Sequence, residues 1–192
     1  MQVLKDDIRL AILDSALTEF STKSYERATM SSIASRCKIS KSNLYRYYES
    51  KESIYHALTA PVMTEIRRAA TYMTSKELLI YSNDEIAKQL TEKLFPTVER
   101  YRKELLVIMN TTLPNQEQSL QEEVIQYMLK CFFTFDETKM PRNFAYTLAS
   151  MIMNGICSII TECDSNEEIY EQLLALFRYH SRGVCAFSKT RT

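Results

Sequence analysis

The stretch YERATMSSIASRCKISKSNLYRYYESKESIYHAL, residues 25–58, decides the fold. Thr29 and Ser40 each suit a helix N-cap, because their hydroxyl groups can accept a hydrogen bond from an unpaired backbone N–H of the first turn. We expect a short helix after each cap, over residues 30–37 and 41–48. Two short helices joined by a tight turn have the outline of a helix-turn-helix.

The two faces of the second expected helix differ in chemistry. Leu44 and Tyr48 are four residues apart, so they share a face that can bury against a neighbouring helix. The opposite face carries hydroxyl, amide, phenol and cationic groups, which suit base edges and phosphates in a DNA major groove. These groups belong to Lys41, Ser42, Asn43, Arg46 and Tyr47. The alternative is that this face is simply the solvated side of a helical bundle.

The distribution of charge favours DNA binding. The chain of 192 residues contains 24 basic and 24 acidic residues, so its formal net charge is zero. From Arg27 to Lys51, however, six residues are basic and only Glu49 is acidic. A DNA-binding domain joined to a second domain of different function is expected to form a basic segment in an otherwise neutral or acidic chain.

Composition predicts an all-α protein. The whole chain has two glycines and four prolines, whereas helix-compatible residues are plentiful. Apolar periodicity predicts about nine helices. We expect them over residues 8–22, 30–37, 41–48, 51–72, 84–95, 96–112, 119–135, 141–162 and 165–187. Pro61 should bend the fourth helix, and Pro96 and Pro141 suit first-turn positions.

Other classes of protein have little support in the sequence. The five cysteines are scattered without a CxxC pair, so they are interpreted as apolar fillers, with redox sensing through one of them left open. His56 and His180 are the two histidines, and no GxSxG, HExxH or phosphate-binding glycine loop occurs, so we expect no enzyme, metal or cofactor. No apolar run reaches about 18 residues and no signal peptide is apparent, which predicts a cytoplasmic protein without a membrane contact.

Residues 12–20, ILDSALTEF, and the stretch 25–58 resemble the N-terminal domain of the TetR/AcrR family of transcriptional regulators. The family pattern is a Thr or Ser cap, an Ile-Ala pair, a Val-Ser turn, a Leu-Tyr-x-Tyr-Phe recognition helix and a Ser-Lys-Glu helix start. This chain has Thr29, Ile33-Ala34, Ile39-Ser40, Leu44-Tyr45-Arg46-Tyr47-Tyr48 and Ser50-Lys51-Glu52 at these places. The register agrees over about a quarter of the chain.

Two residues depart from the family pattern. Lys38 stands in the turn, and Ser24 stands before Tyr25, where the family usually has glycine. A residue other than glycine in a left-handed conformation costs on the order of 1 kcal/mol. Either Lys38 bears this strain, therefore, or the turn has a different shape.

The resemblance implies a helix-turn-helix DNA-binding domain over residues 1–50 and a larger helical domain for effector binding and dimerisation over residues 51–192. Tyr45 and Lys51 would bind phosphates, Asn43 and Tyr47 would face the groove, and Ser31 would approach a base or a phosphate. The expected contacts to double-stranded operator DNA are Thr29, Ser31, Ser40, Lys41, Ser42, Asn43, Tyr45, Arg46, Tyr47 and Lys51.

The function implied by the resemblance is that of a homodimeric repressor, released from a palindromic operator when a small molecule binds the C-terminal domain. The expected effector pocket involves Met63, Arg67, Phe95, Tyr101, Leu105, Met109, Met128 and Phe132. The expected dimer interface involves Leu148, Ile152, Gly155, Ile156, Ile159, Leu173, Leu176 and Phe177. Both sets could instead be core within one chain, and an activator, or an adaptor that binds a protein partner, is the alternative function.

Overall fold

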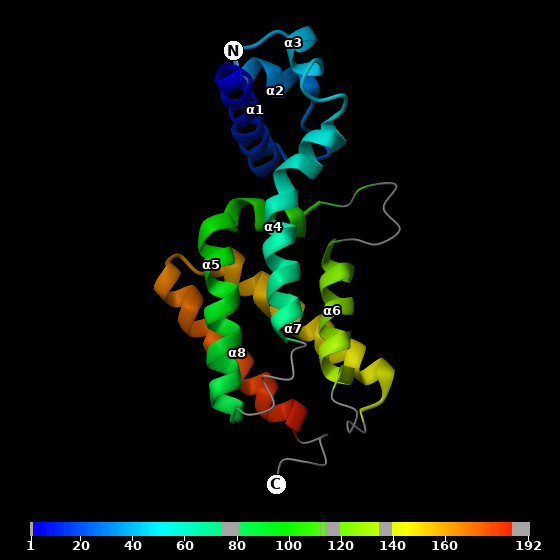
Figure 1. Cartoon of the computed structure of the whole chain (residues 1–192), viewed down its shortest axis with the longest axis vertical. Helices are drawn as coiled ribbons and strands as arrows, with labels where there is room; N and C mark the ends of the chain where they lie inside the picture. The colour runs from blue at the N-terminus through cyan, green and yellow to red at the C-terminus, as the bar shows by residue number, and fades with distance from the viewer. Residues whose placement is uncertain (1, 74–80, 112, 114–119, 135–139, 186–192) are drawn as a thin grey trace. The chain divides into compact units, whose positions relative to one another are not determined.

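The computed structural model describes residues 2–73, 81–111, 113, 120–134 and 140–185, and their regular secondary structure is entirely helical, as predicted (Figure 1). The eight helices within these residues are α1 (Gln2–Lys23), α2 (Met30–Arg36), α3 (Lys41–Tyr45), α4 (Lys51–Met73), α5 (Asn83–Met109), α6 (Leu120–Thr134), α7 (Arg142–Glu162) and α8 (Asn166–Cys185). Helix α4 continues through Pro61.

Helix α5 consists of two helical segments that meet at a kink, as the sequence predicted, but the break lies at Tyr101 and not before Pro96. Pro96 lies inside α5, not in the first turn of a new helix, and the backbone departs from helical geometry only at Tyr101, with φ −122° and ψ 27°. An internal proline removes one backbone hydrogen bond. The next two side chains, Thr97 and Val98, are 6% and 1% exposed, so packing holds this segment in the helix despite that loss.

The chain divides into two compact units. The N-terminal unit comprises Met1–Met63 and Lys103–Leu113, and the C-terminal unit comprises Thr64–Arg102 and Pro114–Thr192. These units differ from the functional division that the sequence analysis places after residue 50, which stays a prediction.

The core of the N-terminal unit joins α1, α2 and α3. Helix α1 packs on α2, and α2 packs on α3. The stripe predicted along the first helix is buried, with Ile12 and Ala16 fully covered and Phe20 3% exposed. Ile33 of α2 and Leu44 of α3 are also fully buried. These apolar faces fix the two short helices against α1, because neither is long enough to be stable alone.

In the C-terminal unit, α6 packs on α7 and α7 packs on α8. Helix α7 is the most apolar element: its mean hydropathy of 1.5 would suit a membrane span by length and composition, although core helices of soluble proteins pass the same test. About 33% of that window is buried within the chain. The guanidinium of Arg102 donates to the carbonyl oxygens of Ile160, at 3.0 Å, and Cys163. Arg102 thereby caps the C-terminal end of α7 with a positive charge.

Candidate nucleic-acid interface

The start of α2 is held by the predicted cap. The Thr29 hydroxyl accepts a hydrogen bond from the Ser32 backbone N–H at 3.1 Å, and the Ser32 hydroxyl accepts one from the Thr29 N–H at 3.1 Å. This reciprocal pair is a capping box, which satisfies two N–H groups that the first turn leaves unpaired. The hydroxyl of Thr29 therefore serves α2 itself.

The turn after α2 is strained, which is one of the two outcomes that the sequence analysis left open. Lys38 has φ 58° and Ser24 has φ 70°, so both adopt the left-handed conformation that the family's glycines would accept readily. The Lys38 N–H donates to the Ser35 carbonyl at 3.1 Å, and the Ile39 N–H donates to the Ala34 carbonyl at 3.0 Å. This bond pattern is a Schellman motif, so Lys38 keeps the turn geometry and bears the strain.

Helix α3 begins as predicted and ends earlier. The Ser40 hydroxyl accepts a hydrogen bond from the Asn43 N–H at 3.1 Å. The helix was expected to reach Tyr48, but it ends at Tyr45, and Arg46 donates its N–H to the Asn43 carbonyl, three residues back. This hydrogen bond tightens the last turn of α3, and α4 begins six residues after Tyr45, at Lys51.

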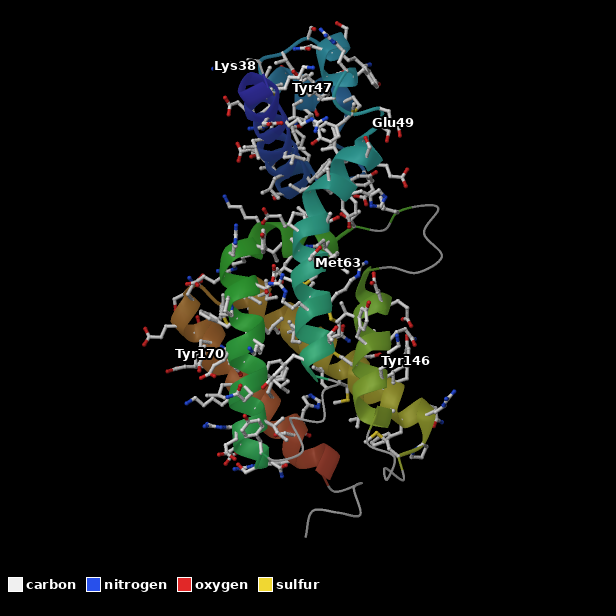
Figure 2. All side chains as sticks on the ribbon, viewed as in Figure 1. Lys38, Tyr47, Glu49, Met63, Tyr146 and Tyr170 are labelled. Atoms are coloured by element: carbon white, nitrogen blue, oxygen red, sulfur yellow. The ribbon has the colours of Figure 1, made fainter. Side chains whose placement is uncertain are left out.

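The predicted DNA-contacting residues lie mostly on the surface of the N-terminal unit, where Figure 2 shows Lys38, Tyr47 and Glu49. Leu44 is the inward anchor of α3, fully buried, whereas Tyr45 is 47% exposed. Exposed side chains are Ser31, Lys41, Ser42, Tyr45 and Arg46, and half-buried ones are Asn43, Tyr47 and Lys51. Tyr48, expected to bury with Leu44, is half-buried, and burial raises the pKa of its phenol.

Tertiary contacts divide the basic residues of this unit into two groups. Arg36 donates to the carboxylate of Glu19 at 2.7 Å, and the Lys51 ammonium donates to three backbone carbonyls. Within the basic segment from Arg27 to Lys51, the exposed cations that form no ion pair with a described residue are Arg27, Lys38, Lys41 and Arg46. This second group supplies the positive potential that a phosphate backbone would meet.

A shallow open hollow of about 330 Å³ adjoins the end of α3. Its lining residues are Tyr45, Arg46, Tyr47, Tyr48, Glu49 and Ser53. The hollow lies between the last turn of α3 and the first turn of α4, so this surface combines phenol groups, a guanidinium and a carboxylate.

Glu19 is a residue of this unit that the sequence analysis missed. Its side chain is 2% exposed and accepts hydrogen bonds from Lys23 at 2.8 Å and from Arg36 at 2.7 Å. The hydrogen bonds, above all the one from Lys23, lower the pKa of Glu19 to about 2 despite its burial. Glu19 therefore links α1 to α2 through its ion pair with Arg36. In the sequence, the position of this carboxylate next to the apolar stripe of α1 could have indicated that it is buried.

The residues predicted for an effector pocket fall in both compact units. Met63, Leu105 and Met109 belong to the N-terminal unit, Arg67, Phe95, Tyr101 and Met128 belong to the C-terminal unit, and the side chain of Phe132 lies outside the described residues. Arg67, a candidate for binding an anion, donates to both carboxylate oxygens of Glu123 at 2.8 and 3.2 Å, which raises the pKa of Arg67. The ring of Phe95 packs edge-on against Tyr170 of α8, with centroids 5.3 Å apart.

Most residues predicted for a dimer interface are buried within one chain. Ile152, Ile156, Ile159, Leu173 and Phe177 are each at most 8% exposed. Leu148, Gly155 and Leu176 are half-buried. A Cβ on Gly155 would lie 3.1 Å from two carbons of Leu176, so this glycine lets α8 of the same chain approach α7. The structure thus accounts for the five buried residues as core, the alternative that the sequence left open.

Comparisons with known proteins agree with the helix-turn-helix geometry. Residues 12–58 match the family model described as bacterial regulatory proteins of the tetR family. The chain is 28% identical over 139 residues to IcaR, the negative transcriptional regulator of the biofilm operon icaADBC in Staphylococcus aureus (strain Newman), a match that covers 67% of this chain and 70% of the relative.

Solved structures show the same fold. A TetR-family transcriptional regulator from Bordetella parapertussis is 24% identical with a TM-score of 0.65, over 88% of this chain and 93% of that one. SmeT, the repressor of the multidrug efflux pump SmeDEF of Stenotrophomonas maltophilia, is 15% identical with a TM-score of 0.63, over 95% of this chain and 91% of that one. Residues 12–58 therefore form a domain of the tetR family of bacterial regulatory proteins, and the chain as a whole has the fold of solved TetR-family regulators.

Proposed function

We propose that the protein is a homodimeric repressor that binds a palindromic operator through α2 and α3 and leaves it when a small molecule binds the C-terminal part of the chain. The observation that carries the proposal is the contrast between the two sides of α3: Leu44 is fully buried, while Lys41, Ser42 and Arg46 are exposed. Such a regulator acts on DNA in the cytoplasm. The printed function of IcaR, negative regulation of transcription, supports the choice of repressor.

The proposed DNA contacts have two kinds of role. Lys41, Tyr45 and Arg46 meet phosphates, together with the exposed Arg27 and Lys38. Ser31, Ser42, Asn43 and Tyr47 approach base edges. The hydroxyl groups of Thr29 and Ser40 serve as helix caps, so these two residues act by holding α2 and α3 in place. With only five residues, α3 is roughly 7 Å long, which limits the number of bases it can read.

The experiment that tests DNA binding is a gel shift with fragments of the gene's own promoter region, at several salt concentrations. Asn43→Ala should weaken binding to the operator by roughly tenfold or more and leave binding to unrelated DNA unchanged, because a base contact contributes about 1–3 kcal/mol of discrimination. Equal loss on both DNAs would contradict the base-reading role. Failure of the wild-type protein to retard any promoter fragment, even in dilute buffer, would overturn the DNA-binding proposal.

We place the dimer contact on the apolar surface that α7 and α8 leave exposed. Met151, 51% exposed, lies one turn before Gly155, and Tyr179, 71% exposed, lies about one turn after Leu176. Because Gly155 and Leu176 approach each other, these exposed side chains belong to neighbouring turns of the two helices. Phe144, 39% exposed, extends the same face of α7, seven residues before Met151. A second copy would cover this surface.

A twofold symmetric dimer explains why the operator should be palindromic, with two copies of α3 about one DNA turn, roughly 34 Å, apart. Met151→Glu or Tyr179→Glu should give monomers in sedimentation, because each places a charge in the contact. Glu171→Gln, at an exposed polar position of α8, is the matched control and should stay dimeric. A wild-type monomer at all concentrations would overturn the dimer proposal.

The effector proposal rests on the likeness to TetR-family regulators. A small molecule that binds the folded protein raises its melting temperature by mass action, so a thermal shift screen of apolar, anionic and cationic compounds tests it. A compound that both stabilises the protein and releases operator DNA would identify the effector class. A protein partner that produces the release in place of any small molecule would favour the adaptor function.

A further inference from the structure

The ammonium of Lys51, the first residue of α4, is held by three backbone carbonyls. Its Nζ donates to the carbonyl oxygen of Tyr25 at 2.6 Å, of Ala28 at 3.0 Å and of Glu26 at 3.3 Å. A protonated lysine has three N–H donors. These hydrogen bonds therefore engage all of the donors that Lys51 could offer to a phosphate.

An aromatic cluster lies beneath the same ammonium. Nζ of Lys51 lies 4.3 Å from the centroid of the Tyr25 ring, within the range of a cation–π interaction. The Tyr25 ring in turn packs against Phe20 of α1 and Tyr55 of α4, with centroids 5.2 Å apart in both pairs. Tyr25 and Tyr55 are 8% and 1% exposed, and the desolvation of this site lowers the pKa of Lys51.

The three carbonyl groups precede the helix-turn-helix in the sequence, and Lys51 follows it. The carbonyls belong to the connection between α1 and α2, whereas Lys51 opens α4. Ala28 and Lys51 are 23 positions apart, and the chain between them contains all of α2, the turn and α3. The hydrogen bonds therefore close a loop around the DNA-reading segment, and such closure limits the conformations open to it.

We propose that Lys51 is a positioning residue that holds α3 in its DNA-reading orientation by closing this loop, and that it makes no phosphate contact in the DNA complex. This inference rests on the proposed function. A phosphate would have to displace three carbonyls and an aromatic ring to reach the ammonium. Lys41 of α3 is different: it is exposed and forms no ion pair within the described chain, and its Nζ lies 5.9 Å from the ring centroid of Tyr45.

Salt dependence separates the two roles. Removing one phosphate contact lowers the slope of log K against log salt by about 0.9. Lys51→Met, which keeps the aliphatic stem and removes the charge, should leave this slope unchanged. It should weaken operator binding by roughly tenfold or more at each salt concentration, because three charge-assisted hydrogen bonds are lost. Lys41→Met is the matched control and should lower the slope by about 0.9.

A second readout observes the ammonium directly. In the free protein, the Lys51 side-chain ¹⁵N–¹H signal should be protected from exchange with water, and its ¹⁵N shift should stay the same when operator DNA is added. Lys51→Arg should recover part of the lost affinity, because a guanidinium can donate to several carbonyls at once. The signal of Lys41 should shift on adding DNA.

Either of two results would overturn the proposal: a loss of about 0.9 in slope for Lys51→Met, or a DNA-induced shift of the Lys51 signal. If Lys51→Met fails to fold, the wild-type signal still decides between the two roles. Failure of the proposed function is distinguishable, because the wild-type protein would then retard no DNA at any salt concentration. In that case the positioning role falls too, although the protected signal in the free protein would still report the carbonyl contacts.

Discussion

Glu19→Gln tests how the buried carboxylate joins α1 to α2. A pKa of about 2 for Glu19, against about 4.3 in an unfolded chain, corresponds to roughly 3 kcal/mol of stability at neutral pH. Lys23 and Arg36 are 50% and 41% exposed, so solvent screening should reduce this figure to about 2 kcal/mol. For a chain of this length the melting temperature should fall by roughly 4–8 °C.

The effect of Glu19 should depend on pH in a defined direction. Because the folded pKa lies below the unfolded one, the stabilisation is present above about pH 4.3 and is lost as the pH falls toward about 2. Thermal unfolding followed by circular dichroism should therefore show a gap between wild type and Glu19→Gln at pH 7 that narrows below about pH 4.

Glu171→Gln, at an exposed position, is the control and should change stability by less than about 0.5 kcal/mol. Equal melting temperatures for wild type and Glu19→Gln, with the same dependence on acid, would refute the reasoning.

Three further substitutions test local geometry by the same unfolding assay. Lys38→Gly should raise stability by up to about 1 kcal/mol, because φ is 58° there, whereas Lys38→Ala keeps the strain and should give no gain. Gly155→Leu should destabilise by about 1–3 kcal/mol, since an added Cβ meets Leu176 at 3.1 Å. The same change at Gly183, where no atom of the described residues lies within 4 Å, should be mild, and equal effects would contradict the close approach. Arg102→Met should destabilise by about 2 kcal/mol, because the end of α7 loses a charged donor to two carbonyls; an unchanged melting temperature would count against this cap.

Some features of the interface follow from local sequence alone. The caps Thr29 and Ser40 were predictable because a cap depends on a hydroxyl and on backbone groups two or three residues away. At Lys38 the sequence left two outcomes open, a strained residue or a turn of different shape, and the φ of 58° shows the first. The burial of Leu44 followed from apolar spacing, which reports one face of a helix whatever packs against it.

The helix boundary predicted at Pro96 was wrong, because packing outweighed a local signal. Pro96 indicated a new helix, but buried neighbours keep α5 continuous as far as the kink at Tyr101. Apolar periodicity in the last two helices predicted contacts between copies, which stays a prediction; residues such as Ile152 and Leu173 are buried within one chain. Periodicity identifies a buried face and does not say which chain supplies the partner.

The sequence by itself determined an all-helical chain with a capped helix-turn-helix and a basic segment around it, because periodicity, capping and turn conformation act over a few residues. Only the tertiary structure decided which of those cations have hydrogen-bond partners within the protein. Arg36 donates to Glu19, 17 positions away, and Lys51 donates to Ala28, 23 positions away. In the sequence, these two cations look equivalent to Lys41, which forms no ion pair within the described residues. Hydrogen-bond partners at such separations depend on how the helices pack, and no local pattern encodes them.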